Sequence, residues 1–438
     1  MPPLRLPAFL AIALFACTAR IVAAADGDLD PAFGDGHQRL IARTGAEGLV
    51  NARIGDVTTL ADGRAIWGIE DGVGGVWIER MRRDGQPDPA FAADGRLELQ
   101  ACVADRPLRL VALADRRVVV WAGACLLRLL ADGSIDPGFD ATDGPPPAFH
   151  AAELRVDANG RFVLAGTEAQ AWRVYRFQAN GAIDPTFAKA GVATIPVTSG
   201  SGQRTLATMA LDADQRIVLG GWRANTSGTN LVLARLTVDG AADSGFGADG
   251  IVDLGAPAGY SGISAHALAI DRDGSLVVAG EASNGMQSCC VLFARFGADG
   301  ALPPQNLRLF ALGANVTLSA FAETSTSIAV LPRGKVLIAR NAFPFATTTR
   351  TRFTLVRLHA DGTPDLSFEG SGWRSYVVND PAGVGQSGPY TQIHGMAQAE
   401  GAALMFGRTF FEDNAIGVDY VSLMRARFDD LFVEGFEH

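Results

Sequence analysis

The chain has 438 residues, a formal net charge of −10, 51 glycines and only 19% charged residues. This composition is typical of short strands joined by tight turns, and it argues against a coiled coil or a disordered chain. The chain has two lysines, Lys189 and Lys335, and no basic cluster, which argues against nucleic-acid binding because phosphates must be neutralised by clustered cations.

The first 25 residues are predicted to be a cleaved secretory signal peptide. Arg5 supplies the positive start, and the apolar stretch from Leu6 to Ala16 is too short to span a bilayer. Small residues from Val22 to Ala25 offer a cleavage site. A second interpretation is a lipoprotein anchored at Cys17, although the flanking residues fit that pattern poorly. We therefore expect a secreted or periplasmic protein with no membrane span.

After residue 25, a turn with the pattern D-G-x-x-D-x-x-F recurs along the chain. Its second aspartate and its phenylalanine are Asp30 and Phe33, Asp88 and Phe91, Asp136 and Phe139, Asp184 and Phe187, Asp243 and Phe246, and Asp365 and Phe368. A worn copy at Asp299 and Gly300 ends in Pro303 and Pro304 instead. A period of about 50–60 residues with strand-like filling predicts a ring of repeated sheets.

Each repeat reads as four strands, which in the second repeat are Arg96 to Gln100, Leu108 to Leu113, Arg117 to Trp121 and Leu126 to Leu130. The third strand is a nearly continuous apolar run in several repeats, and such a strand needs cover on both faces. Sheets stacked face to face around a ring supply that cover. We therefore predict an all-β fold, a seven-bladed β-propeller with four antiparallel strands per blade over residues 26–428, followed by a short tail, 429–438.

Two alternatives to this architecture stay open. One is a ring of six or eight blades, because Pro145 to Pro147 interrupt the first strand of the third repeat. The other is an open β-solenoid.

The strand order also predicts how the ring closes. The chain enters the ring with an inter-blade turn and leaves it after a fourth strand, Val421 to Phe428, so no strand is left over to complete a blade from the other terminus. We expect closure by packing of the first and last blades alone, aided by the tail from Leu431 to Phe436. The fourth strands carry arginines between apolar neighbours, which is typical of an outer strand with one wetter face: Arg235, Arg295, Arg357 and Arg427.

These motifs resemble the delta-60 repeat family of bacterial proteins. The resemblance is carried by the segments from Phe246 to Val252, from Asp273 to Gly280 and from Leu233 to Gly240, and it extends over most of the chain from Asp26 to Phe428. It implies an exported, propeller-like repeat protein and no catalytic set of residues. The ending from Leu431 to Glu437 also resembles a short tail found on various exported bacterial proteins.

The repeated aspartates are candidates for metal ligands or for turn formers. Asp26, Asp28 and Asp30 alternate like the start of a calcium loop, but Pro31 follows and His37 stands where the loop needs glutamate. We interpret the aspartates as turn residues and the phenylalanines as apolar plugs between blades. No metal and no cofactor is predicted.

Four cysteines follow the signal peptide. Cys102 and Cys125 are expected at one rim of the same blade, where a disulfide is compatible with export. Cys289 and Cys290 open the fourth strand of the fifth repeat, and a vicinal disulfide, two free thiols and an intermolecular bridge all stay open.

The loops between third and fourth strands vary in length, and recognition usually lies on such loops of a rigid scaffold, although loop drift without function is the alternative. Histidines occupy matching second strands, and we interpret His266 and His394 as partly buried or rim histidines. The alternative is that both face a shared solvent-filled mouth. The candidate binding residues on and near this rim are Tyr260, Phe321, Phe343, Phe345, Tyr390, His266, His394 and Phe411.

The function predicted from these features is binding without catalysis, by an exported monomer whose partner is a protein or polysaccharide at or outside the cell surface. A propeller hydrolase or lyase acting on carbohydrate or peptide is the second hypothesis, because propeller enzymes assemble sites from dispersed loops. A purely structural repeat module is the third.

Overall fold

The structure is a computed structural model that describes residues 26–34, 38–42, 53–70, 75–99, 102, 107–123, 125–139, 144–146, 148–195, 203–285, 287–312, 316–318, 326–344, 352–376, 387–399, 401–413 and 416–428. The predicted signal peptide, the alternative lipid site Cys17 and the tail after residue 428 lie outside these residues. No helix in the described ranges is long and apolar enough to cross a membrane.

The regular secondary structure of the described residues is almost entirely β-strand, arranged in antiparallel sheets. The first sheet contains β2 (Arg53–Thr59), β3 (Ala65–Glu70), β4 (Val76–Met81) and β5 (Arg96–Glu98). The next contains β6 (Arg109–Ala112), β7 (Val118–Ala122) and β8 (Cys125–Leu129). It is followed by β9 (His150–Val156), β10 (Phe162–Glu168), β11 (Ala171–Phe177) and β12 (Val192–Ile195).

Two four-stranded sections then join through a single parallel bridge between Thr229 and Gly262. One section contains β13 (Arg204–Leu211), β14 (Ile217–Asn225), β15 (Gly228–Leu236) and β16 (Ile251–Leu254). The other contains β17 (Gly262–Ile270), β18 (Leu276–Asn284), β19 (Gln287–Phe296) and β20 (Leu307–Phe310), the last preceded by the short 3-10 helix η1 (Pro304–Asn306).

The last two sheets contain the strands nearest the C-terminus and one strand from the N-terminus. β21 (Val316–Leu318) and β22 (Ser327–Val330) both pair with β23 (Val336–Pro344), which is followed by β24 (Arg352–Leu358) and β25 (Trp373–Tyr376), with η2 (Pro332–Gly334) between β22 and β23. The final sheet contains β26 (Ser387–Ala399), β27 (Ala402–Asp413), β28 (Ile416–Arg427) and β1 (Gln38–Ala42).

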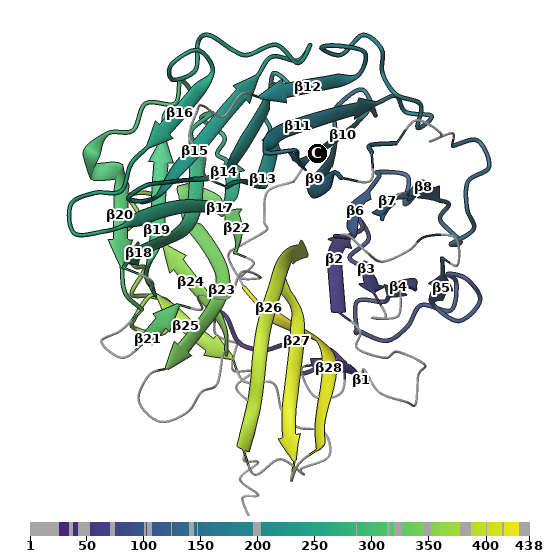
Figure 1. Cartoon of the computed structure of the whole chain (residues 1–438). Helices are drawn as coiled ribbons and strands as arrows, with labels where there is room; N and C mark the ends of the chain where they lie inside the picture. The colour runs from purple at the N-terminus through teal and green to yellow at the C-terminus, as the bar shows by residue number, and fades with distance from the viewer. Residues whose placement is uncertain are drawn as a thin grey trace, which may run out of the picture.

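The sheets are arranged around a common centre, as Figure 1 shows, with β2, β6, β9, β13, β17, β22 and β26 nearest to it. The second strand of each sheet is covered on both faces by its neighbours, and β7 is buried at every position for this reason. The hydrophobic core accordingly consists of a series of clusters between adjacent sheets, such as the one that joins Val218 and Phe246 to Val278 and Leu292.

The repeat begins one strand later than the sequence pattern indicated. Arg96–Glu98 (β5), predicted to be the first strand of the second repeat, pairs instead with β4 as the outermost strand of the first sheet. The predicted unit was therefore wrong by one strand, because the D-G-x-x-D-x-x-F turn leads to the outer edge of the same sheet before the chain enters the next one. The proline-rich segment near Pro146 lies where an outer strand would follow β8, and the described part of that sheet has three strands.

The prediction that no strand completes a blade from the opposite terminus was also wrong. β1 pairs with β28 in antiparallel register from Gln38 opposite Met424 to Ala42 opposite Tyr420. The turn that precedes β1 is held as well, since the Gly27 N–H donates to the Arg427 carbonyl at 2.7 Å and Leu29 bridges to Ala426. Main-chain hydrogen bonds between the two ends of the chain therefore close the ring.

Replacing Phe246 by alanine should lower the free energy of unfolding by about 3–5 kcal/mol, because the ring is fully buried between adjacent sheets. Denaturant titration measures the change. Leu366→Ala is the control, since Leu366 is 63% exposed and its truncation should change stability by no more than about 0.5 kcal/mol. A loss below about 1 kcal/mol for the Phe246 variant would contradict the role as a plug.

Replacing Gly27 by alanine should destabilise the protein more than the same change at Gly259. Both glycines have positive φ, +86° and +91°, so both alanines carry similar backbone strain of about 1–2 kcal/mol. Only at Gly27 would the new Cβ meet another side chain, Phe368 Cε2 at 2.5 Å, whereas nothing lies within 4 Å at Gly259. Denaturant titration should therefore show that Gly27→Ala lowers the free energy of unfolding by about 1–3 kcal/mol more than Gly259→Ala does. Equal losses would show that the N-terminal turn is not docked.

Candidate functional site

The repeated turn residues form one contact with an arginine that the sequence pattern did not connect to them. In five copies an arginine eight positions before the aspartate binds its carboxylate and also covers the phenylalanine ring. We call this contact the Arg–Asp–Phe unit, and its members are Arg80, Asp88 and Phe91; Arg128, Asp136 and Phe139; Arg176, Asp184 and Phe187; Arg235, Asp243 and Phe246; and Arg357, Asp365 and Phe368.

Within each unit the two carboxylate oxygens have separate partners. In the third copy, Asp184 Oδ1 accepts the Thr186 N–H at 3.0 Å, while Oδ2 lies 2.7 Å from Arg176 Nε. The Arg176 guanidinium lies 4.5 Å from the centroid of the Phe187 ring, where its charge meets the negative face of the ring. The Arg176 side chain is 2% exposed. Of the arginines predicted to lie on a wetter face, Arg235 and Arg357 are each 5% exposed and therefore buried, whereas Arg427 is 40% exposed.

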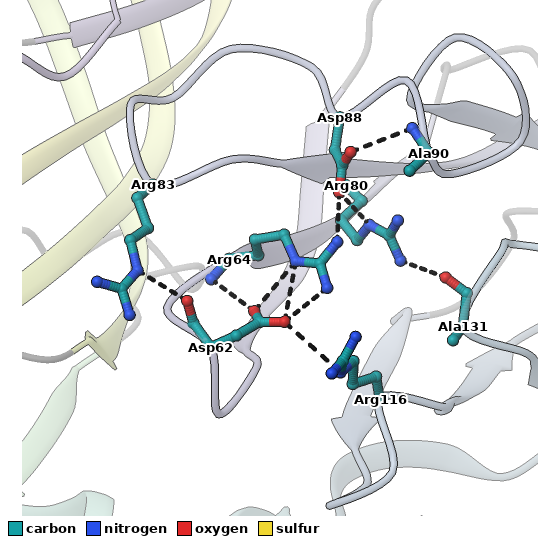
Figure 2. A network of polar contacts seen from close by, with 8 residues as sticks. All are labelled: Asp62, Arg64, Arg80, Arg83, Asp88, Ala90, Arg116 and Ala131. Atoms are coloured by element: carbon teal, nitrogen blue, oxygen red, sulfur yellow. Dashed lines mark hydrogen bonds and ion pairs between the residues drawn. The ribbon is translucent and has the colours of Figure 1, made fainter.

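A second cation binds the same aspartate from the start of the second strand. Figure 2 shows the first copy, in which Asp88 lies between Arg80 and Arg64, with Arg64 Nη1 at 2.7 Å from Asp88 Oδ2. Arg64 in turn is held by Asp62 at 2.5 Å. Lys335 takes the place of Arg64 in the last copy and contacts Asp365 at 2.7 Å. The charges alternate in sign through the network, which offsets the cost of burying them.

The Arg–Asp–Phe unit also reaches the next sheet along the ring. The Arg80 guanidinium donates to the Ala131 carbonyl, as Figure 2 shows, and Arg128 Nη1 donates to the Ala179 carbonyl at 2.7 Å. Arg176 and Arg235 donate in the same way to Val238 and Ala298. Each unit therefore joins its own sheet to the turn of the following one.

The same contact spans the two ends of the chain. Arg425 occupies the equivalent position in β28, since the Asp30 N–H donates to its carbonyl at 2.8 Å, and its Nη1 donates to the Arg83 carbonyl at 3.0 Å. Its side chain lies 3.5 Å from Asp30. Arg427, which the alternation of the fourth strand had suggested, lies two residues after Arg425 and also forms an ion pair with Asp30.

The worn copy lacks both aspartate and phenylalanine, and other residues take their places. Arg295 binds Asp271 at 2.6 Å and donates to the Ala360 carbonyl at 3.0 Å. A Cβ built on Gly362 would lie 2.4 Å from the Phe293 ring, just as one on Gly300 would lie 2.9 Å from Phe246. A strand phenylalanine thus fills the space that the turn phenylalanine fills elsewhere.

At the centre of the ring lies a cavity of about 1090 Å³. Its wall contains residues of β2, β6, β9, β13, β17, β22 and β26, together with Glu70 from the end of β3. His266 and His394 both line it, which agrees with the alternative interpretation of a shared mouth rather than with the preferred one.

A β-bulge at the same place in five of the inner strands shapes this wall. The residues left without a cross-strand partner are Gly55, Ala152, Ala207, His266 and His394, and all of them line the cavity. A bulge inserts one residue and re-aims its side chain, which explains why both histidines are found on the cavity wall. In the sequence, such a bulge appears only as one extra residue between two stretches of alternating apolar and polar residues. This signal is too weak to identify a bulge by itself.

The charged groups of the wall are held by main-chain atoms and by one another. Arg109 Nε donates to the carbonyl of Ala152 at 2.6 Å, and its Nη1 donates to that of Gly55 at 3.3 Å, so it ties two bulges together. Arg155 forms an ion pair of 2.8 Å with Glu153. Sequence reasoning missed these residues because none belongs to the repeated motif.

Two carboxyl groups of the wall have raised pKa values. Burial raises the pKa of Asp56, although Arg109 and the N–H groups of Leu110 and Val57 counteract the shift. Burial likewise raises the pKa of Glu153 against the opposing effect of Arg155.

The histidines have their own partners. His394 Nδ1 lies 3.0 Å from the Ile54 carbonyl. His266 Nε2 is 2.8 Å from Ser264 Oγ, and burial lowers the pKa of His266, which favours its neutral form. No group of three or more His, Cys, Asp or Glu residues in the described ranges is arranged to hold a metal ion.

The aromatic rim residues are not brought to this cavity where the structure describes them. Tyr260 packs instead against the hydrophobic cluster that contains Cys290. Phe321 and Phe345 lie outside the described residues, and Phe343, Tyr390 and Phe411 are described only as strand positions.

The disulfide that the sequence allowed between Cys102 and Cys125 is present, with a Cα–Cα distance of 5.6 Å. It joins two neighbouring sheets rather than two strands of one blade, because Cys102 follows β5 and Cys125 begins β8. A disulfide of this kind indicates an oxidising, extracytoplasmic location.

Three segments of the chain, residues 158–187, 213–246 and 334–368, match the family model described as "Domain of unknown function (DUF5122) beta-propeller". Each segment ends on the phenylalanine of an Arg–Asp–Phe unit, Phe187, Phe246 or Phe368. The chain therefore contains β-propeller repeats, in agreement with sheets arranged around a centre. Comparison with curated proteins finds no match.

Solved structures with a similar arrangement include the BT4673 extracellular domain from B. thetaiotaomicron, which is 11% identical with a TM-score of 0.43 over 87% of this chain and 39% of that one. The chain thus spans about two fifths of that domain. Polysaccharide lyase Uly1 is 10% identical, with a TM-score of 0.46 over 87% and 91% of the two chains. The intramolecular trans-sialidase from Ruminococcus gnavus is 11% identical, with a TM-score of 0.40 over 94% and 100%.

Replacing Asp365 by asparagine should lower the free energy of unfolding at neutral pH by up to about 3–5 kcal/mol, because it removes one of the two carboxylates, Asp365 and Asp26, that pair with the buried Arg357. Denaturant titration measures the loss, and Asp249→Asn, at an exposed position, is the matched control.

The loss at Asp365 should depend on pH in a defined direction. Burial alone would raise the pKa of Asp365, but Lys335, Ser367 and Arg357 outweigh burial and hold the pKa well below its usual range. The stabilisation is therefore complete above the unfolded pKa of about 4 and is lost as the pH falls towards the folded value. The difference between wild type and variant should shrink below about pH 4, and a constant difference would contradict the ion pair.

Proposed function

We propose that this protein is an exported, seven-bladed β-propeller that binds a hydroxyl-rich ligand, such as the end of a polysaccharide, in its central cavity without chemical conversion. Seven inner strands contribute to one wall, which supports the blade number. The delta-60 resemblance and the disulfide support export. The observation that carries the proposal is the cavity itself.

The size and shape of the cavity suit a small ligand or one end of a chain. Its volume of about 1090 Å³ lies just above the usual range for ligand pockets, about 300–1,000 Å³. A folded protein partner would need a wide surface instead, and of the aromatic residues predicted for such a surface Phe321 and Phe345 lie outside the described residues, while Tyr260 packs in a hydrophobic cluster. The rim stays a second proposed contact.

The polarity of the wall suits hydroxyl groups. Acidic Asp56, Glu70 and Glu153 face the same space as basic Arg109 and Arg155, so acceptors and donors are both present and their charges nearly cancel. A hydroxyl group both donates and accepts, and it can therefore bind to either kind of side chain. A strongly charged ligand would find no matching excess of charge.

The contacts of the charged groups favour binding over catalysis. Arg109 is anchored to two bulge carbonyls, and Arg155 is paired with Glu153. Groups held in this way are pre-organised, and pre-organised polar groups give specificity at low entropic cost.

One observation favours a hydrolase or lyase as the second candidate. The raised pKa values of Asp56 and Glu153 are the property that a general acid needs near neutral pH. A purely structural module is the remaining alternative, and it requires that the cavity binds nothing.

Replacing Ala207 by tryptophan should abolish binding, because this bulge residue faces the cavity and a large side chain there would occupy it without removing a polar group. Isothermal titration calorimetry with a panel of soluble oligosaccharides should show binding by the wild type and at least about tenfold weaker binding by the variant. Ala114→Trp, an exposed position outside the cavity, is the control.

Three other results of this experiment would contradict the proposal. Equal binding by the Ala207 variant would place the ligand elsewhere, for example on the rim. Release of new chain ends from a bound oligosaccharide would favour the enzyme. Absence of binding across the panel by the wild type would favour the structural module.

A further inference from the structure

Two adjacent cysteines in β19 lie sulfur to sulfur. Cys289 and Cys290 are not joined by a disulfide, yet their Sγ atoms are 2.9 Å apart and the Cys290 thiol donates to its neighbour. Neither residue belongs to the central cavity or to an Arg–Asp–Phe unit. Their contact therefore serves no role described so far.

A β-bulge explains how neighbouring residues of a strand come to share one side. Successive side chains of a regular strand point to opposite faces, which would keep the two sulfurs apart. Here Ala282 pairs with Cys290 and Ser283 pairs with Ser288, so Cys289 is the extra residue of the bulge. The bulge turns the Cys289 side chain towards Cys290.

The two thiols differ in their exposure to solvent. Cys289 is partly exposed, and its Sγ donates to the Ala282 carbonyl at 3.4 Å. Cys290 is 9% exposed and packs in the cluster between β15 and β18, with its Sγ 3.9 Å from the Tyr260 hydroxyl. A reagent in solution can meet the first sulfur, and the second is sheltered but within reach of the first.

We propose that Cys289 and Cys290 form a reversible vicinal disulfide by exchange with low-molecular-weight disulfides in the compartment where Cys102 and Cys125 are bridged. The Cys289 thiolate attacks one sulfur of the reagent RSSR, forms a mixed disulfide and releases RS⁻, which takes up the proton lost by Cys289. The Cys290 sulfur then attacks Cys289, closes the ring and releases the second RSH. Two thiols are oxidised, and one RSSR is reduced to two RSH.

The vicinal ring should be easier to reduce than the bridge between the two sheets. Adjacent residues have Cα atoms about 3.8 Å apart, which is shorter than the about 4.4–6.8 Å of ordinary disulfides, so ring closure is strained. The Cys102–Cys125 bridge has a Cα–Cα distance of 5.6 Å, within that range. Strained disulfides are the labile ones.

The rate of ring closure should rise with pH. Burial and the hydrogen bond from Cys290 raise the pKa of the Cys289 thiol well above its ordinary value, so little thiolate is present at neutral pH. Because the thiolate is the nucleophile, the rate should increase about tenfold per pH unit while the thiol predominates.

The test uses the folded, full-length protein, reduced mildly so that Cys102–Cys125 remains closed, then incubated with glutathione disulfide, alkylated and analysed by peptide mass spectrometry. We expect the peptide with both cysteines to become unalkylated and two hydrogen masses lighter, with no lasting glutathione adduct. The C290S variant should instead keep glutathione on Cys289, because no second thiol resolves it. Titration with a dithiol should reopen the vicinal ring before the Cys102–Cys125 bridge.

The proposal is overturned if both thiols of the wild type stay fully alkylatable at every pH tested. It is also overturned if wild type and C290S accumulate the same stable adduct. The C289S/C290S double variant controls for the fold, since it should retain the Cys102–Cys125 bridge and the melting temperature within a few degrees.

Discussion

The ring depends on one repeated interaction, in which a buried arginine binds an aspartate, covers a phenylalanine and donates to the next sheet. The three side chains stabilise one another. Burial of the arginine would be costly without the carboxylate, and the phenylalanine fills the apolar gap beside the ion pair. In the third copy all three contacts meet at Arg176, which is 2% exposed. The unit thus converts a stack of separate sheets into a ring in which each sheet fixes the next.

The ends of the chain follow the same rule. β1 adds to β28, Asp30 contacts Arg425 and Arg427, and Gly27 lies against Phe368. N-terminal residues thus complete an Arg–Asp contact that the five Arg–Asp–Phe units make within one continuous segment. Because the ring is closed, its inner strands together form the wall of the central cavity. The bulges in five of those strands then aim short and long side chains at one cavity, which is the basis of the proposed binding.

Local sequence patterns predicted what depends on neighbouring residues. The Asp-Gly turns, the alternation of strands and the apolar second strands each follow from a few consecutive positions, and they led to the all-β propeller. The phase of the repeat could not be found in this way, because Arg96–Glu98 reads as a strand whether it pairs with β4 or with β6. The eight-residue spacing from Arg176 to Asp184 was present in five of the six intact copies, but alternation alone suggested a wet face where the structure has a buried ion pair.

The sequence by itself determined the fold class and the turns, because turn chemistry and strand periodicity act over short distances along the chain. Only the tertiary structure decided which strand completes each sheet, that β1 closes the last one and that Cys102 bridges to the neighbouring sheet. It also decided which side chains face the centre, as with His266, His394 and Arg109. These outcomes depend on register and on bulges of a single residue, which arise when distant strands pair and which leave almost no trace in local composition.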